Sequence, residues 1–158
     1  MAESTAEWTP NELRLVPRFD EALRLREEER YQEAIDILAS VVESLEARDV
    51  RLLTHSHLQI AYICELLGNE AGRERHFSLA TRVAPNYDLA SLGLFHTLMS
   101  QRRFTEGLQE MLRYLTIKDA PDYVEMLADE VFGSDLLESD RELVKQARLL
   151  VKRRREMN

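Results

Sequence analysis

The sequence predicts an all-α protein, and three observations support this prediction. Leu, Glu, Arg and Ala dominate the 158 residues, a composition typical of packed helices. The chain has only five glycines and four prolines, which argues against an all-β fold and against long flexible linkers. Apolar residues recur at helical spacing, and no segment alternates as a strand would. We therefore expect helices with short connections in a single domain of residues 1–158.

The N-terminal part, residues 1–14, is expected to be a polar arm followed by a short helix. Thr9 is a good N-cap and Pro10 suits the first helical position. Glu12 adds a negative charge to the first turn, where the helix dipole favours it. These signals predict a short lead-in helix over residues 10–15.

Pro17 predicts a break after that short helix, because a proline disfavours helical geometry at the residue before it, here Val16. A first full helix should then cover residues 18–28 and end in the charged turn of residues 26–30. The apolar positions of this helix form one stripe at helical spacing. They are Phe19, Ala22, Leu23 and Leu25.

The remaining helices follow from their apolar periodicity and their stop signals. We expect them over residues 31–47, 49–67, 70–83, 89–101, 105–117 and 122–132, with a last helix that ends at residues 152–155. Gly68 separates two of them, and Pro85 ends the next because proline cannot continue a helix. Thr105 is a plausible N-cap, and Gly133 suits the left-handed position after a helix.

The last helix has an acidic or polar start and a basic end. Ser139 or Asp140 is expected to cap it. Residues 152–155 are the one basic cluster of the sequence, and cations at a helix C-terminus complement the helix dipole. The alternative is a patch for nucleic acid or for an acidic partner.

The helix pairs repeat along the chain. Gly68 lies between two predicted helices, and Arg102, 34 residues later, lies in a polar break at residues 101–103 between the next two. Residues 29–34 form the same kind of break upstream. A period of 34 residues with two helices in each repeat is typical of a helical solenoid.

One repeat, residues 54–87, carries a recognisable set of residues at this period. They are Ile60 and Ala61 in its first helix, Gly68 at its turn, and Phe77, Ala80 and Pro85 in and after its second helix. These positions resemble the motif of the tetratricopeptide repeat (TPR) family. The repeat that starts at Leu15 offers Ala22, Tyr31, Ala34, Leu38 and Val41, and the repeat that starts at Asp88 offers Leu94, Phe104, Gly107 and Met111.

The sequence departs from the TPR motif by an insertion and by residues in two repeats. The first two repeats begin 39 residues apart, so about five residues are inserted around residues 46–50. Arg73 stands where the motif has a small residue that lets the two helices touch, and Glu70 stands where an aromatic residue is usual. In the third repeat, Phe95 and Tyr114 each replace a small residue of the motif. The array is therefore a degenerate one.

The resemblance implies a right-handed solenoid of about three TPR-like helical hairpins over residues 15–121, with C-terminal capping helices in residues 122–158. It also implies a concave groove, lined by the first helix of each repeat, that binds a partner. The groove positions are Phe19, Leu23, Arg26, His55, Leu58, Tyr62, Glu65, Leu66, Leu89, Leu92, His96 and Met99. The alternative is that the chain's own first or last helix covers several of these positions, which would then be core.

The function that this resemblance implies is a non-enzymatic interaction module. A peptide or segment of a partner protein would lie in the groove, as in an adaptor, an assembly factor or a chaperone. Small bacterial secretion chaperones of this architecture have a similar length. The alternative function is that of an immunity-type or inhibitory protein, which would bind and block a folded toxin or enzyme domain through its acidic surface. Homo-oligomerisation is open.

Charge and hydropathy restrict the partners and the location. The net charge of −8 argues against general nucleic-acid binding. No run of about 18 apolar residues is present, so we expect no membrane span. The acidic and polar N-terminus does not resemble a secretory signal, and a cytoplasmic location is the expectation.

The residues with catalytic or ligating potential predict no enzyme, no metal and no cofactor. Cys64 is the only cysteine and has apolar neighbours, which favours packing over nucleophilic chemistry. His55 and His57 are two residues apart, so a helix would point them in different directions. His76 and His96 lie on other predicted helices, and no cysteine or carboxylate stands at ligand spacing.

Overall fold

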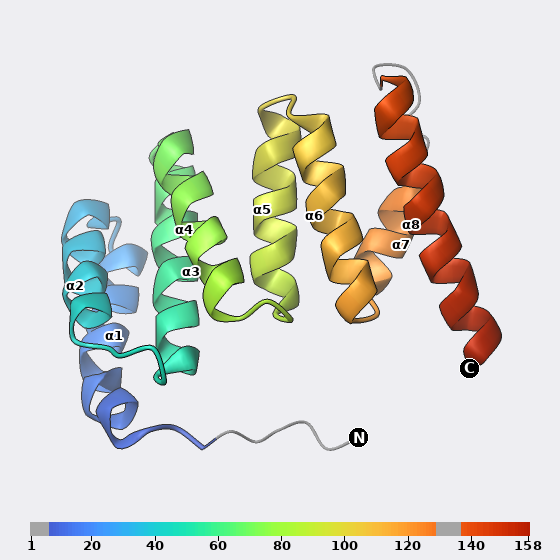
Figure 1. Cartoon of the computed structure of the whole chain (residues 1–158). Coiled ribbons are helices and arrows are strands. Elements are labelled where there is room, and N and C mark those ends of the chain that lie inside the picture. The colour runs from blue at the N-terminus through green and yellow to red at the C-terminus, as the bar shows by residue number, and fades with distance from the viewer. Residues whose placement is uncertain (1–6, 129–136) are drawn as a thin grey trace. The chain divides into compact units, whose positions relative to one another are not determined.

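The computed structural model describes residues 7–128 and 137–158, and within them it is all-helical, as predicted. The helices are α1 (Pro10–Glu27), α2 (Tyr31–Glu43), α3 (Val50–Leu66), α4 (Glu70–Val83), α5 (Asp88–Ser100), α6 (Phe104–Ile117), α7 (Pro121–Ala128) and α8 (Glu138–Met157) (Figure 1). No residue of the described part forms a strand. The chain divides into two compact units, which we call unit 1 (Met1–Ala84) and unit 2 (Pro85–Asn158) and describe in turn.

The predicted breaks are three turns of the same geometry. They join α1 to α2, α3 to α4 and α5 to α6, and each pair packs as a helical hairpin (Figure 1). Each turn has one residue in the left-handed region, at Glu29 (φ 60°), Gly68 (φ 68°) and Arg102 (φ 58°). The N–H of the residue after it donates to the carbonyl oxygen five residues earlier, at 2.9, 2.8 and 2.9 Å. This bond satisfies a carbonyl that the end of the helix would leave free.

In unit 1, α1 is a single helix of 18 residues, with Pro17 inside it, so the predicted break at Val16 and Pro17 is wrong. A proline inside a helix removes one hydrogen bond and costs about 3 kcal/mol. Packing on both sides of Pro17 offsets that cost, because Leu15 and Ala22 are both buried. Pro17 itself is exposed, so its ring meets solvent rather than the core.

The start of α1 follows the predicted signals, and one of its residues also serves α3. Thr9 is the N-cap, and its hydroxyl accepts the Glu12 N–H at 3.1 Å, while one Glu12 carboxylate oxygen accepts the Thr9 N–H at 3.1 Å. The other Glu12 oxygen accepts the Leu52 N–H, in the first turn of α3, at 2.7 Å. Glu12 is buried, and it therefore joins the N-termini of two helices.

Helix α2 ends at Glu43, four residues before the predicted end, because side chains take over the backbone groups that follow. The Asn11 amide donates to the Ser44 carbonyl at 3.0 Å. The Asp49 carboxylate accepts the Glu46 N–H at 2.8 Å and the Thr9 hydroxyl at 2.5 Å. These bonds, led by the one from the Glu46 N–H, lower the pKa of Asp49.

The α3/α4 hairpin of unit 1 packs closely where a glycine allows it. A Cβ at Gly72 would lie 2.8 Å from the Cys64 Sγ, so the two helices could not approach as they do with a larger residue there. Arg73, at the position where a TPR motif has a small residue, is buried. It reaches Glu65 at 3.2 Å and Glu70 at 3.6 Å.

In unit 2, helix α8 packs on α6 and on α7. The buried core of this unit is formed by Phe95, Leu108, Met111, Tyr114, Leu115, Ala120, Tyr123, Leu127, Val144 and Ala147. The predicted C-terminal helices therefore cover the apolar side of α6.

The ends of the unit 2 helices correct two predictions, and a third prediction lies outside the described residues. Thr105 is not an N-cap: α6 begins at Phe104, and the Thr105 hydroxyl instead donates to the buried Asp140 carboxylate in α8. Helix α8 begins at Glu138, before both predicted caps, Ser139 and Asp140; the Asp140 carboxylate accepts the Leu137 N–H at 3.2 Å. The predicted end of α7 at residue 132, and its stop at Gly133, fall outside the described residues.

Within the described ranges no helix has both the length and the apolar character needed to cross a bilayer.

Candidate partner-binding surface

The predicted site residues of α1 lie on the side of the helix that meets α3. Phe19, Leu23 and Arg26 are all half-buried. The Arg26 guanidinium donates to the side-chain oxygen of Gln59 in α3 and so links the two first helices of unit 1. The sequence did not point to Gln59, because a glutamine in a helix carries no distinctive signal.

The predicted site residues of α3 differ in how much surface they offer. Leu58 is only 2% exposed and belongs to the core, whereas Leu66 is 62% exposed. Tyr62 is half-buried, and its ring meets the edge of Phe77 in α4, with ring centroids 5.5 Å apart. Glu65 is exposed and pairs with Arg73. His55 is half-buried, and burial followed by the nearby Arg51 lowers its pKa.

In unit 2, the predicted residues of α5 fall into three groups. Met99 turns toward α6, since a Cβ at Gly107 would lie 2.9 Å from its Sδ. Leu89 is 46% exposed near the start of α5. Leu92 and His96 lie together, because they are one helical turn apart, and both line a pocket.

That pocket has a volume of about 400 Å³ and lies between α5 and α7. Its lining residues are Leu92 and His96 from α5 and Asp122, Glu125 and Met126 from α7. We call it the α5/α7 pocket. Its apolar side chains, Leu92 and Met126, are half-buried, and its two carboxylates are exposed. An apolar floor beneath two carboxylates suits a side chain with an aliphatic stem and a positive end, such as lysine or arginine.

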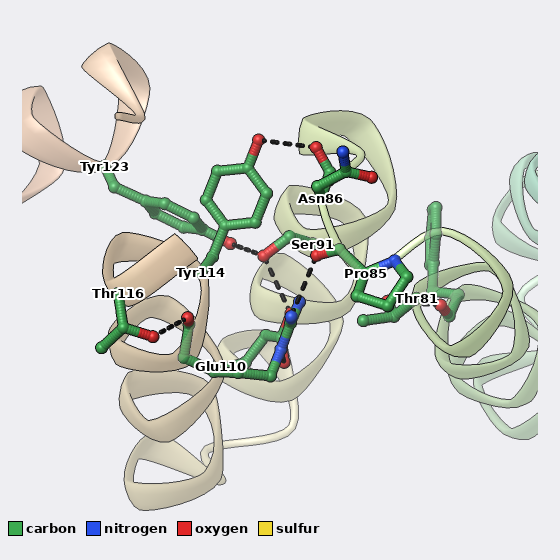
Figure 2. Close-up of polar contacts among 10 residues, drawn as sticks. Thr81, Pro85, Asn86, Ser91, Glu110, Tyr114, Thr116 and Tyr123 are labelled. Atoms are coloured by element: carbon green, nitrogen blue, oxygen red, sulfur yellow. Dashed lines mark hydrogen bonds and ion pairs between the residues drawn. The ribbon is translucent and has the colours of Figure 1, made fainter. Parts of the chain in front are cut away.

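A buried polar network joins α7 to α5 through Tyr123 and Ser91 (Figure 2). These two residues are next in sequence to the pocket residues Asp122 and Leu92. The Tyr123 hydroxyl lies 2.7 Å from the Ser91 hydroxyl, and the Ser91 hydroxyl donates to the Glu110 carboxylate at 2.9 Å. Ser91 has a single hydrogen, so Tyr123 must donate to it. Arg113 completes the chain with two bonds to the Glu110 carboxylate, at 2.8 and 2.5 Å.

The outer part of the network ties α6 to the start of unit 2. Arg113 also donates to the Pro85 carbonyl at 2.9 Å, and the Tyr114 hydroxyl donates to the Asn86 carbonyl at 3.3 Å (Figure 2). Burial raises the pKa of Tyr114 to about 12 and that of Tyr123 further, so both phenols keep their protons. Tyr123 lies beside Asp122, so this network positions the α7 wall of the pocket.

Two histidines that the sequence placed on separate helices come together in unit 1. The Nδ1 atoms of His57 in α3 and His76 in α4 are 3.1 Å apart. Burial, followed by the charges of His76 and Arg75, lowers the pKa of His57 to about 4. Both residues lie at similar distances in sequence from the turn at Gly68, one on each side of it. This spacing is the signal from which their contact could have been predicted. The described residues contain no group of three or more His, Cys, Asp or Glu side chains arranged to hold a metal.

Comparison of the chain with protein-family models, with curated proteins and with solved structures finds no match. The likeness to TPR repeats therefore depends on the residues and the turns described above.

Proposed function

We propose that the chain is a non-enzymatic, TPR-like interaction module that binds a segment of another protein along the first helices of its hairpins. The three hairpins α1/α2, α3/α4 and α5/α6 would be the repeats, and α7 and α8 the C-terminal cap. The left-handed turns support this proposal, because each joins the two helices of a hairpin. Two of them, at Gly68 and Arg102, are 34 residues apart, which is the length of one TPR repeat.

The α5/α7 pocket is the observation that carries the proposed function. Two residues expected to line a groove, Leu92 and His96, do line a pocket in unit 2. The C-terminal helix α8 packs on α6 and α7, and the pocket stays open. In unit 1 the α1/α3 side offers further contacts for a segment, with the linked Arg26 and Gln59 and the exposed Leu66.

The chemistry of the pocket specifies part of the partner. Asp122 and Glu125 favour a cationic residue, and Leu92 and Met126 favour the aliphatic stem that carries it. The proposed partner segment therefore contains a lysine or arginine beside apolar residues. An adaptor, an assembly factor or a chaperone would use such a site to hold a client segment.

Selection from a random peptide library on the full chain tests this function. Enriched peptides should combine basic and apolar residues, and the double variant Asp122→Asn with Glu125→Gln should weaken their binding about tenfold in fluorescence anisotropy. The control is Glu138→Gln with Glu142→Gln, two exposed acids of α8 outside the pocket, which should change binding less than about twofold. Absence of such peptides, or equal effects of both double variants, would contradict the proposal.

A further inference from the structure

A second groove lies in unit 2, on the other side of α7, and its charge is opposite to that of the α5/α7 pocket. Two adjoining hollows between α7 and α8, of about 380 and 280 Å³, share Val124, Val151 and Arg155. We call them together the α7/α8 groove. Its lining residues are Asp119, Ala120, Pro121, Val124, Glu125, Leu127, Arg148, Val151, Lys152, Arg154, Arg155 and Asn158.

The groove has an apolar floor. Val124 and Leu127 come from α7, and Val151 comes from α8. Val124 and Val151 are half-buried, so part of each side chain remains accessible. An accessible apolar floor between two helices accepts an aliphatic side chain of a partner.

Two of the four cations of the groove fasten α8 to α7. The Arg148 guanidinium donates to the Leu127 carbonyl, in the last turn of α7, at 3.1 Å. Arg154 pairs with Asp119, just before α7, at 3.1 Å. These two contacts join α8 to α7 and to the residues just before it.

The other two cations are not needed to hold the helices together. Lys152 is exposed, and among the described residues its one ion pair is with Glu156, at 3.8 Å. Arg155 forms no hydrogen bond or ion pair with any residue of the described part. Arg148, Val151, Lys152 and Arg155 follow the i, i+3, i+4, i+7 spacing, so Lys152 and Arg155 lie on the same face of α8 as the floor residue Val151.

Charge decides what the groove accepts. Its lining has four cationic and two acidic side chains, whereas the whole chain has a net charge of −8. The helix dipole alone accounts for cations near the end of α8. The dipole of α8 does not explain why these cations surround an apolar floor to which α7 also contributes.

We propose that the α7/α8 groove binds an acidic segment of a partner protein, in which an aliphatic side chain lies beside carboxylates. The aliphatic side chain packs on Val124, Leu127 and Val151. The carboxylates meet Lys152 and Arg155 at the rim. This surface shares only Glu125 with the α5/α7 pocket, and the two select segments of opposite charge.

The test uses the full chain and a second selection from a random peptide library, made on the variant Asp122→Asn to weaken the α5/α7 pocket, because Glu125 also lines the groove. Enriched peptides should combine Asp or Glu with Leu, Ile or Val. Lys152→Glu with Arg155→Glu should weaken the best peptide at least about tenfold, and raising NaCl from about 0.05 M to 0.3 M should weaken it as well.

The matched control is Lys145→Glu with Arg153→Glu, which changes the charge of α8 by the same amount at exposed residues outside the groove. It should change the affinity less than about threefold. Equal losses of affinity in the two double variants would show that the net charge of α8 explains the effect. That result would contradict binding in the α7/α8 groove. The proposal also fails if no acidic peptide is enriched, or if phosphatidylserine vesicles bind the chain and the acidic peptide does not.

Discussion

The phenolic oxygen of Tyr123 lies 2.7 Å from the hydroxyl oxygen of Ser91, and both residues are fully buried. This contact joins α7 to α5 and continues through Glu110 to Arg113. Every polar group along this line has a partner, which is the condition for a buried network to add stability. It also determines where the α7 residues of the α5/α7 pocket stand.

Removal of the Ser91 hydroxyl should destabilise unit 2 more than removal of the Tyr123 hydroxyl. Ser91→Ala leaves a buried phenol without an acceptor and takes one donor from Glu110, so we expect a loss of about 2 kcal/mol. Tyr123→Phe leaves the Ser91–Glu110 bond intact and should cost about 1 kcal/mol. In the double variant no phenol is left without an acceptor, so its loss should be smaller than the sum of the two single losses. Urea unfolding followed by circular dichroism measures all three variants. Full additivity would contradict the Ser91–Tyr123 contact, and a larger loss in Tyr123→Phe than in Ser91→Ala would contradict the inferred direction of the bonds.

Substitution of the buried Glu12 should destabilise unit 1 strongly. Its carboxylate accepts the N–H of the α1 N-cap, Thr9, and an N–H in the first turn of α3, so Glu12→Ala should destabilise the unit by about 2 kcal/mol. Glu21→Ala, an exposed position in the middle of α1, should change stability by less than about 0.5 kcal/mol. Similar unfolding midpoints for the two variants would show that the double cap contributes nothing.

In the left-handed turns, removing a glycine and introducing one should change the stability in opposite directions. Gly68→Ala should cost about 1 kcal/mol from backbone strain alone, because a Cβ there meets no atom within 4 Å. Glu29→Gly should raise stability by up to about 1 kcal/mol, because Glu29 has φ 60°. The control Glu21→Gly, inside α1, should lower stability by about 1 kcal/mol. Thermal unfolding of the three variants checks the signs, and a loss in Glu29→Gly would contradict the prediction.

The His57–His76 pair should make unit 1 less stable in mild acid. The pKa of His57 is about 4 in the folded chain and about 6.5 when unfolded, so the unfolded state binds more protons between these values. The contribution of His57 to the free energy of unfolding is therefore fully present above pH 6.5. It falls as the pH approaches 4, by on the order of 2 kcal/mol. Hydrogen exchange of the α3 amides should show this slope.

The variant His57→Gln has no ionisable group at this position and should reduce the slope, while the exposed His96→Gln in unit 2 should keep it. Part of the slope should remain in His57→Gln, because burial also lowers the pKa of His55 and of His76. The carboxylate of Asp49 has a lowered pKa, so its own contribution is lost only below about pH 4 and does not overlap this window. An unchanged slope in His57→Gln would assign the acid sensitivity to other groups.

Apolar periodicity was enough to predict the helices and their pairing, because each helix has one stripe that must be buried. It was not enough to predict helix ends. Pro17 stays inside α1 because buried neighbours outweigh a local preference, and Glu43 ends α2 because Asn11 and Asp49, distant in sequence, bind the backbone beyond it. Local rules do not contain such contacts.

The candidate site was predictable only in part for the same reason. Leu92 and His96 were identified from the first-helix face of a repeat, and both line the α5/α7 pocket. The other three lining residues come from α7, whose contact with α5 depends on Ser91 and Tyr123, 32 residues apart. Leu58 was expected to line the groove, but it lies in the core. Helix α3 is buried on several sides, so its apolar periodicity does not distinguish a groove position from a core position.

The single thiol of the chain provides a built-in reporter of hairpin opening. Cys64 is 4% exposed and faces Gly72 across the α3/α4 hairpin, and burial raises its pKa. Alkylating reagents attack the thiolate, so they should reach Cys64 only when α4 separates from α3. The labelling rate then measures how often unit 1 opens, and it needs no engineered cysteine or attached dye, even inside a cell.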